Sequence, residues 1–260
     1  MTDLKNLIER PKIDTHFHTG GWNVVQPKQD FKSLSKLLDK YNIIKAITSS
    51  TRALNDDLAE GNAETAALCA TEHRYYGLVV VNPLAPKESI REINKYLDNP
   101  RFVGCKTIQD FYGLTLEDTR YYAILDYLAE ISGRVRWPLM CHLGGLAGAA
   151  RDWPLTFIAA HATHALADGT FDRLLSGHNI FFDIATSTAV KSRCPLENLV
   201  KLAPRKSVVF SSDAPLLDPA LTLGKLASLG LSDETLEDIL LNSAPLAFPR
   251  LSNAPNIRQI

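Results

Sequence analysis

The sequence of 260 residues lacks the features that define several large classes of protein. No apolar run reaches the roughly 18 residues that a membrane-spanning helix needs, and residues 1–12 are charged where a secretion signal would be apolar. The net charge of −1 gives no electrostatic reason to expect nucleic acid or an anionic membrane surface as a partner. No Cys-x-x-Cys spacing indicates a zinc knuckle or a disulfide framework among Cys69, Cys105, Cys141 and Cys194. We therefore expect a cytoplasmic protein with free thiols.

Apolar runs rich in β-branched residues alternate with segments of helical periodicity along the whole chain. We expect strands at residues 13–18, 43–49, 76–81, 102–108, 139–143, 157–161, 180–185 and 207–212. Helical patterns lie between them at 31–41, 55–72, 87–97, 116–131 and 196–202, and two more helices are expected within 218–248. The helix at 116–131 follows a Thr115-x-x-Asp118 capping pattern, whereas the crossover at 144–156 is short for an ordinary helix.

Eight strands that alternate with helices favour right-handed parallel crossovers. At this length the natural closed arrangement is a (β/α)8 TIM barrel, an α/β fold that forms a single domain over residues 1–260. An open, doubly wound parallel sheet is the rival architecture. However, no expected strand is followed by a Gly-x-Gly-x-x-Gly or Walker loop, which removes the usual reason for such a sheet to bind a nucleotide.

The first expected strand ends in a His-x-His pair within Ile13-Asp14-Thr15-His16-Phe17-His18. Alternate side chains of a strand share a face, so Asp14, His16 and His18 are expected to point one way and Phe17 the other. Two imidazoles at the C-terminal end of a strand are well placed to hold one metal ion. A His-x-His pair alone also occurs as an ordinary structural feature, so the other strands must supply further ligands.

Further candidate ligands follow other strands at the barrel end where active sites lie. Lys106, His142 and His161 lie at the C-terminal ends of the fourth, fifth and sixth expected strands, and Asp213 directly follows the eighth. Neutral imidazole and carboxylate groups suit zinc or a similar divalent ion. His73 and His178 precede strands, so we interpret both as structural.

Seven segments match known family motifs in order across nearly the whole chain. They are residues 13–18, Val103-Gly104-Cys105-Lys106, Cys141-His142, residues 157–161, residues 181–187, Val209-Phe210-Ser211-Ser212-Asp213-Ala214-Pro215 and Leu240-Leu241-Asn242. By these motifs the sequence resembles the amidohydrolase superfamily, specifically the amidohydrolase-related branch that includes aminocarboxymuconate semialdehyde decarboxylase-like enzymes. One departure is His161-Ala162-Thr163-His164, where relatives often carry glycine two residues after the first histidine.

The resemblance implies that His16, His18, His142 and Asp213 bind one divalent metal ion, most often zinc, and that His161 stands beside the water on the metal. Such an ion lowers the pKa of its water from about 15.7 towards about 7. Asp213 is then expected to accept the proton of the water as the catalytic base, with His161 assisting.

Three residues are candidates for binding a small-molecule substrate. In relatives a lysine at the place of Lys106 is carboxylated and bridges two metals, contacts the substrate unmodified, or is structural; we choose the unmodified lysine and one metal. Arg151 is placed to hold a substrate carboxylate, as is Arg52, although both also fit ordinary surface positions. Trp22 either forms a wall of the pocket or packs in the core.

Three functions follow from these residues. The first is metal-dependent hydrolysis of a C–O or C–N bond in a small molecule, and the second is non-oxidative decarboxylation of an aromatic or unsaturated acid at the same metal. A barrel that binds ligand without turnover is the third. We favour the hydrolase and expect a chain that can form a homo-oligomer. Cys141 and His142 are neighbours in a strand and face opposite sides, so they are not a nucleophile and its base.

Overall fold

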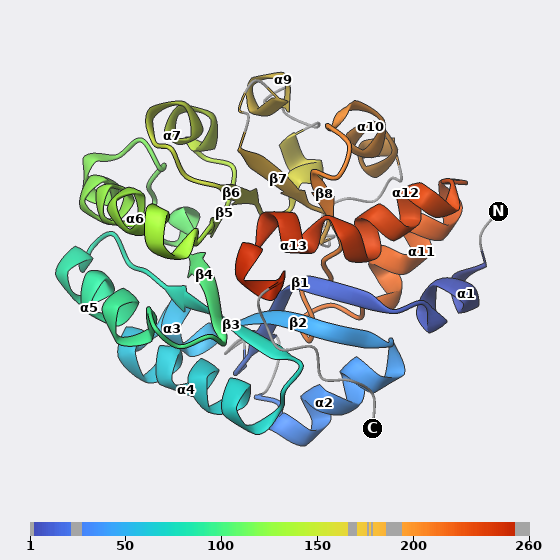
Figure 1. The fold of residues 1–260 in the computed structure, drawn as a ribbon, viewed down its shortest axis with the longest axis horizontal. Coiled ribbons are helices and arrows are strands. Elements are labelled where there is room, and N and C mark those ends of the chain that lie inside the picture. The colour runs from blue at the N-terminus through green and yellow to red at the C-terminus, as the bar shows by residue number, and fades with distance from the viewer. Residues whose placement is uncertain are drawn as a thin grey trace.

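The computed structural model describes residues 3–21, 28–165, 171–175, 177, 179–185 and 194–252. Eight parallel strands form one sheet in the sequential order β1 to β8, and helices surround it (Figure 1). The strands are β1 (Lys12–Thr19), β2 (Ile43–Ser50), β3 (Tyr75–Val80), β4 (Phe102–Lys106), β5 (Leu139–Cys141), β6 (Phe157–Ala159), β7 (Ile180–Asp183) and β8 (Val208–Val209). The expected TIM barrel is therefore confirmed.

The helices between the strands cover the outside of the barrel (Figure 1). The α-helices are α1 (Leu4–Glu9), α2 (Phe31–Lys40), α3 (Thr51–Asn55), α4 (Leu58–Thr71), α5 (Pro86–Tyr96), α6 (Tyr122–Val135), α7 (Leu146–Asp152), α9 (Phe171–Leu175), α10 (Cys194–Leu202), α11 (Ala220–Ser228), α12 (Asp233–Glu237) and α13 (Ala244–Ala247). Shorter turns are the 3-10 helices η1 (Gln109–Tyr112), η2 (Thr119–Tyr121), η3 (Ala162–His164) and η5 (Pro249–Ser252), with a π-helical turn η4 (Asp238–Asn242). None of the helices in the described part of the chain combines the length and apolar character that a membrane crossing requires.

The barrel closes where β1 meets β8 and the segment that follows it. The amide of Thr15 donates to the carbonyl of Phe210 (3.0 Å), and the amide of Asp213 donates to the carbonyl of His16 (2.9 Å). Beyond them, the amide of His18 donates to the carbonyl of Ala214 (2.7 Å). These bonds place the motif at 13–18 beside the motif at 209–215, at the same end of the barrel.

A register shift in β1 decides which of its residues face the barrel interior. The pairing with β2 shifts between Asp14 and Phe17, as in a β-bulge. Ile13 accordingly belongs to the apolar cluster of the interior, whereas Phe17, four residues on, packs against Tyr75 in the cluster under the helices. The carboxylate of Asp14 accepts from Ser212 and from the backbone amide of His16, whereas the rings of His16 and His18 face Asp213, so the strict alternation expected for this strand was wrong at Asp14.

The C-terminal segment closes the barrel at the N-terminal ends of the strands. Its residues Ala244, Ala247, Phe248 and Leu251 pack on the interior cluster, and α13 crosses this end of the barrel in Figure 1. Arg250 donates to the carbonyl of Phe102 at the start of β4. The C-terminal ends of the strands therefore remain as the end where a site can open.

Two local expectations for the helices need correction. The helix after β4 begins at Tyr122 and not at 116, because the amide of Leu116 donates to the carbonyl of Gly144. Asp118 instead caps η2 by accepting from the amide of Arg120. The short crossover after β5 does contain a helix, α7, whose small alanine and glycine residues let it pack closely; Gly148 lies directly against the side chain of Glu117.

Candidate active site

β1 brings the two histidines of the His-x-His pair to the C-terminal end of the barrel. His16 and His18 are both buried, and their ring centroids are 5.1 Å apart. β1 ends at Thr19, and Gly20 follows with a φ of 90°, a conformation that a residue with a side chain rarely adopts. The chain can therefore turn away directly after the second histidine.

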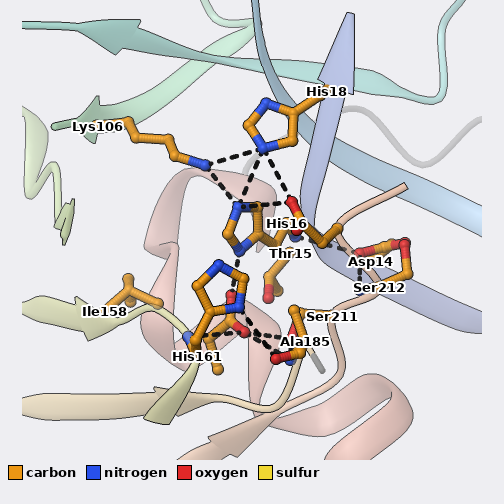
Figure 2. Close-up of polar contacts among 12 residues, drawn as sticks. Asp14, Thr15, His16, His18, Lys106, Ile158, His161, Ala185, Ser211 and Ser212 are labelled. Carbon is orange, nitrogen blue, oxygen red and sulfur yellow. Dashed lines mark hydrogen bonds and ion pairs between the residues drawn. The ribbon is translucent and has the colours of Figure 1, made fainter. Parts of the chain in front are cut away.

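Asp213 completes a compact group of three potential metal ligands. Its Oδ1 lies 3.4 Å from Nε2 of His16 and 3.1 Å from Nε2 of His18, and the two imidazole nitrogens are 3.2 Å apart. The three residues form one of two groups in the described part of the chain whose ligand atoms lie close enough to share an ion; the other consists of His16, His161 and Asp183. Figure 2 shows the two rings, which both point into the barrel.

Lys106, from the end of β4, points its ammonium group at these two imidazoles (Figure 2). Nζ donates to Nε2 of His16 (2.6 Å) and lies 3.3 Å from Nε2 of His18. Burial lowers the pKa of Lys106 to about 8. Burial, together with the nearby Lys106, also lowers the pKa of His18 to about 3 and lowers that of His16, so both imidazoles are neutral near pH 7.

The four histidines expected in the site share one hydrogen-bonding arrangement. Each Nδ1 faces an oxygen that can only accept, namely Asp183 Oδ2 for His16 (2.7 Å), the Ser49 carbonyl for His18 (3.3 Å), Asp110 Oδ2 for His142 (2.7 Å) and the Ala185 carbonyl for His161 (3.1 Å). Nδ1 must therefore be the donor in each pair. In a neutral imidazole, Nε2 then carries the lone pair that a metal ion or a proton requires.

Asp183, at the end of β7, supports two of these histidines. Besides His16, its carboxylate accepts from Ser211 Oγ (2.7 Å), the amide of Ala185 (2.7 Å) and the amide of His161 (3.4 Å). Burial opposes ionisation, but the contacts with His16, His161 and Ser211 lower the pKa of Asp183 to about 2. The sequence motif at 181–187 contained this residue without indicating a role for it, because its partners come from other strands.

Asp213 and His161 have an unusual backbone conformation. Their φ angles are 63° and 54°, in the left-handed region that residues other than glycine seldom occupy. Such strain is found mostly where function requires a side chain in a particular place. Here it directs the Asp213 carboxylate to the two histidines and places the ring of His161 5.0 Å from that of His16, centroid to centroid.

His142 lies in the same cavity but outside the three-residue group. Its ring is 5.4 Å from that of His161, edge to face, and its Nδ1 donates to Asp110. That hydrogen bond lowers the pKa of Asp110, so its carboxylate is ionised near pH 7. Asp110 was not among the residues expected in the site, because it lies four residues beyond Lys106 on a turn that sequence periodicity does not place.

The site residues open into a cavity of about 510 Å³. His16, His18, His142, His161 and Asp213 line its polar part, together with Asp110 and His164. The apolar part is formed by Ile108, Phe111, Leu143 and Leu216 among others. The volume and the mixed lining are those of a small-molecule site.

The structure does not bring every expected residue to this cavity. Arg151 is exposed, pairs with Asp152 (2.8 Å) and lines a separate cavity beside α7. Arg52 is exposed and lies near acidic side chains of its own surface. His73 is exposed at the start of β3, beside Glu72. Trp22 and His178 lie outside the described residues, and the expectations for them stay predictions.

The donor atoms present fit a divalent metal ion. Two neutral imidazole nitrogens and one carboxylate oxygen converge on a small buried volume. Three acceptors at such distances repel one another unless a cation lies among them, and in this arrangement the ammonium of Lys106 faces them. His16, His18 and Asp213 therefore form a site suited to a divalent metal.

A barrel with such a ligand group at the C-terminal ends of its strands is typical of one class of protein, the metal-dependent enzymes. A family model described as Amidohydrolase matches residues 13–245. The chain therefore belongs to the amidohydrolase family of enzymes, as its motifs predicted. No curated protein sequence matches the chain significantly.

Solved structures show the same fold at low identity. A 5-carboxyvanillate decarboxylase from Novosphingobium aromaticivorans, with manganese and 4-hydroxy-3-methoxy-5-nitrobenzoic acid, is 15% identical with a TM-score of 0.70, covering 93% of this chain and 96% of the other. A probable 2-pyrone-4,6-dicarboxylic acid hydrolase from Acinetobacter baumannii, with citric acid bound, is 14% identical with a TM-score of 0.69 and coverages of 92% and 100%. A 2,6-dihydroxybenzoate decarboxylase from Rhizobium is 13% identical with a TM-score of 0.71 and coverages of 92% and 99%.

Proposed function

We propose that this protein is a metal-dependent hydrolase that cleaves a C–O or C–N bond of a small molecule such as a lactone, ester or amide. The observation that supports it is the convergence of the Nε2 atoms of His16 and His18 with a carboxylate oxygen of Asp213, at the edge of a cavity that His161 also lines. This arrangement combines a metal site with proton-accepting groups, which is what hydrolysis by water requires.

The proposed ligands are His16, His18, His142 and Asp213, and the proposed metal is one zinc ion. Catalytic zinc commonly has three protein ligands, such as two imidazoles and a carboxylate, with a position left for water, and it can expand to five ligands. Manganese is the metal named in one related structure, so it is the alternative to test. When bound, such an ion lowers the pKa of its water to about 7 and polarises a carbonyl oxygen of the substrate.

Asp213, His161 and Asp183 are proposed to carry out the proton transfers and to orient the ligands. Asp213 directs one carboxylate oxygen at the imidazoles, and its other oxygen is proposed to accept the proton of the attacking water. His161 donates from Nδ1 to the Ala185 carbonyl, so its Nε2 carries a lone pair that can accept a hydrogen bond from water. Once Nε2 is protonated, it can donate that proton to the leaving group. Asp183 keeps His16 in its orientation throughout.

Substrate contacts belong to the same proposal. Lys106, unmodified, offers a buried ammonium group to a carbonyl or carboxylate of the substrate, and Trp22 is kept as a further candidate for substrate binding. The cavity volume suits a single ring with its substituents. Cys69, Cys105 and Cys141 are free and buried, which supports a reducing compartment such as the cytoplasm.

A second candidate function is non-oxidative decarboxylation of an aromatic or unsaturated acid. The observation that favours it is the ammonium group of Lys106 among the imidazoles, because a cation at that depth can face a substrate carboxylate. Phe111 and Ile108 provide apolar surface for a planar ring. In this reaction, Asp213 or His161 would deliver a proton to the carbon that loses carbon dioxide.

The metal content of the purified protein tests the site. We expect about one equivalent of zinc or manganese in the wild type by elemental analysis and a large loss in the His16→Ala variant, since His16 contributes a ligand of the three-residue group. Arg52→Ala, on the surface of α3, is the control and is expected to retain the metal. A correctly folded wild type that binds neither ion would contradict the proposal.

Two substrate panels separate the two reactions. The metal-loaded protein is assayed for hydrolysis of lactones, esters and amides and, in parallel, for release of carbon dioxide from hydroxylated benzoic acids. Turnover of the first panel alone supports the hydrolase, and carbon dioxide release alone supports the decarboxylase.

A further inference from the structure

The turn that follows β4 contacts His142 through two consecutive side chains, Gln109 and Asp110. Gln109 is fully buried, and its amide nitrogen donates to the carbonyls of His142 (2.7 Å) and Gly144 (3.1 Å). Its amide oxygen accepts from the backbone amide of His142 (3.0 Å). One side chain thus pairs with both polar backbone groups of the same residue, because a primary amide carries both a donor and an acceptor.

Asp110 contacts the side chain of that residue. Its Oδ2 accepts from Nδ1 of His142 at 2.7 Å, a short distance typical of a hydrogen bond to a charged acceptor. The Asp110 side chain is 59% exposed and that of His142 is 22% exposed, so this pair lies at the mouth of the cavity. Gln109 therefore orients the backbone of His142, and Asp110 orients its ring.

His142 differs in this respect from the other histidines of the site. His16 and His18 lie within β1, whose residues are all buried, and their Nδ1 atoms face Asp183 on β7 and a carbonyl of β2. β5 ends at Cys141, one residue before His142. The sheet therefore stops short of His142, and side chains of the neighbouring turn supply the hydrogen bonds that a sheet would otherwise provide.

We propose that Gln109 and Asp110 are positioning residues that keep His142 in the tautomer and orientation in which Nε2 presents its lone pair to the cavity. The proposal extends the proposed function, because it explains how a residue beyond the end of β5 can serve as a metal ligand. Carboxylates that accept from the second nitrogen of a histidine ligand typically raise metal affinity by 10- to 100-fold, roughly. Without Asp110, the proton can move to Nε2 and block that nitrogen.

The first test is the tautomer of His142 in the full-length protein without added metal. Nitrogen-15 NMR of the imidazoles distinguishes a protonated Nδ1 from a protonated Nε2, and the spectrum of a His142→Gln variant assigns the signals. We expect the proton on Nδ1 in the wild type and a mixture of tautomers in Asp110→Ala. Asp110→Glu retains a carboxylate and is expected to restore part of the wild-type tautomer.

The second test is affinity for zinc and for manganese, each titrated alone. We expect Asp110→Ala to weaken binding by about 10- to 100-fold and Gln109→Met to weaken it as well. The matched control is Asp39→Ala, because Asp39 is similarly exposed (67%) and accepts one hydrogen bond from Arg74, at 2.6 Å, away from the site. Thermal unfolding of all variants identifies any loss that comes from misfolding.

The outcomes separate this proposal from the one on which it builds. If Asp110→Ala keeps both the wild-type tautomer and the wild-type affinity, the positioning role is overturned. A wild type that binds neither metal overturns the metal site, and the tautomer comparison then still decides whether Asp110 controls His142.

Discussion

The two ends of the barrel each bury a lysine, and the two lysines have different kinds of partner. At the N-terminal end, Lys12 is fully buried and donates to backbone carbonyls, among them those of Ile8 (3.0 Å) and Tyr41. At the C-terminal end, Lys106 is also buried, but its partners are the imidazole nitrogens of His16 and His18. The carbonyls are fixed by the main chain, whereas the imidazoles are side chains that can accept other ligands.

Arg250 repeats the arrangement of the N-terminal end. Its guanidinium group donates to the carbonyls of Leu97 (2.8 Å), Asn99 (3.2 Å) and Phe102 (3.1 Å) and lies over the ring of Trp137. A cation bound to carbonyls joins segments of the chain and contributes to stability. A cation beside imidazoles and carboxylates lies among groups that can exchange a proton or bind a metal, so the comparison assigns stability to one end and chemistry to the other.

The largest effect is expected from Asp213→Asn at the C-terminal end. The variant keeps the shape of the side chain but removes both its charge and its ability to accept a proton, so kcat/KM should fall by roughly 100- to 10,000-fold. Steady-state kinetics on the substrate identified in the panels measures it. The free energy of unfolding should change little, and activity within tenfold of the wild type would remove Asp213 from the mechanism.

Arg250→Met at the opposite end should lower the free energy of unfolding and leave the activity unchanged. Three carbonyls would lose their donor, and a loss of about 2–4 kcal/mol in the free energy of unfolding is expected. Urea denaturation measures the loss, and kcat per folded molecule should not change. The control is Arg134→Met, because Arg134 is 60% exposed and pairs with the exposed Asp98, so its loss should stay within about 0.5 kcal/mol. A fall in kcat for Arg250→Met would show that the two ends are coupled.

The sequence predicted the barrel and most of the residues that meet at its C-terminal end, because both follow from local patterns. Strand periodicity and the position of polar residues at strand ends suffice to bring His16, His18 and Asp213 to one end of a closed parallel sheet. The same reasoning placed His142 and His161 at that cavity, which the structure confirms as lining residues, while their chemical roles remain proposals.

The residues that orient the histidines could not be predicted in this way. Asp183 contacts a histidine of β1 and Asp110 a histidine that follows β5, and nothing in the spacing along the chain records which residue a turn or strand will face. The position of Asp14 was also mistaken, because a register shift of one residue reverses the face of a side chain and leaves no clear mark in the sequence. Arg151 was expected to bind the substrate because it follows β5, but a residue near a strand end can still point to the outer surface.

A smaller effect, on the free energy of unfolding, is expected from replacing a strained residue by glycine at each end of the barrel. Arg136, exposed after α6 and before β5, has a φ of 47°, and His161 after β6 has a φ of 54°. Glycine adopts this region freely, so Arg136→Gly should raise the free energy of unfolding by about 0.5–1 kcal/mol with unchanged activity. His161→Gly relieves the same strain but also removes the hydrogen bond to the Ala185 carbonyl, so we expect a smaller gain and a large fall in kcat.

Unchanged activity in His161→Gly would contradict the interpretation that strain at this position serves the chemistry. Unfolding curves and steady-state kinetics on both variants, measured side by side, give the comparison directly.

The smallest effect is expected in thiol labelling under native conditions, for which each end of the barrel offers a buried cysteine. Cys69 lies near the N-terminal ends of the strands, where its carbonyl is within 3.5 Å of Nε of Arg101, and Cys141 ends β5 next to the site. Burial raises the pKa of Cys69 to about 12 and that of Cys141 at least as strongly, so almost no thiolate is present at pH 8. In a Cys194→Ser background, a thiol reagent should therefore label neither residue until urea unfolds the chain. If Cys141 reacts under native conditions while Cys69 does not, the catalytic end opens locally without global unfolding, and the difference between the two ends extends from chemistry to dynamics.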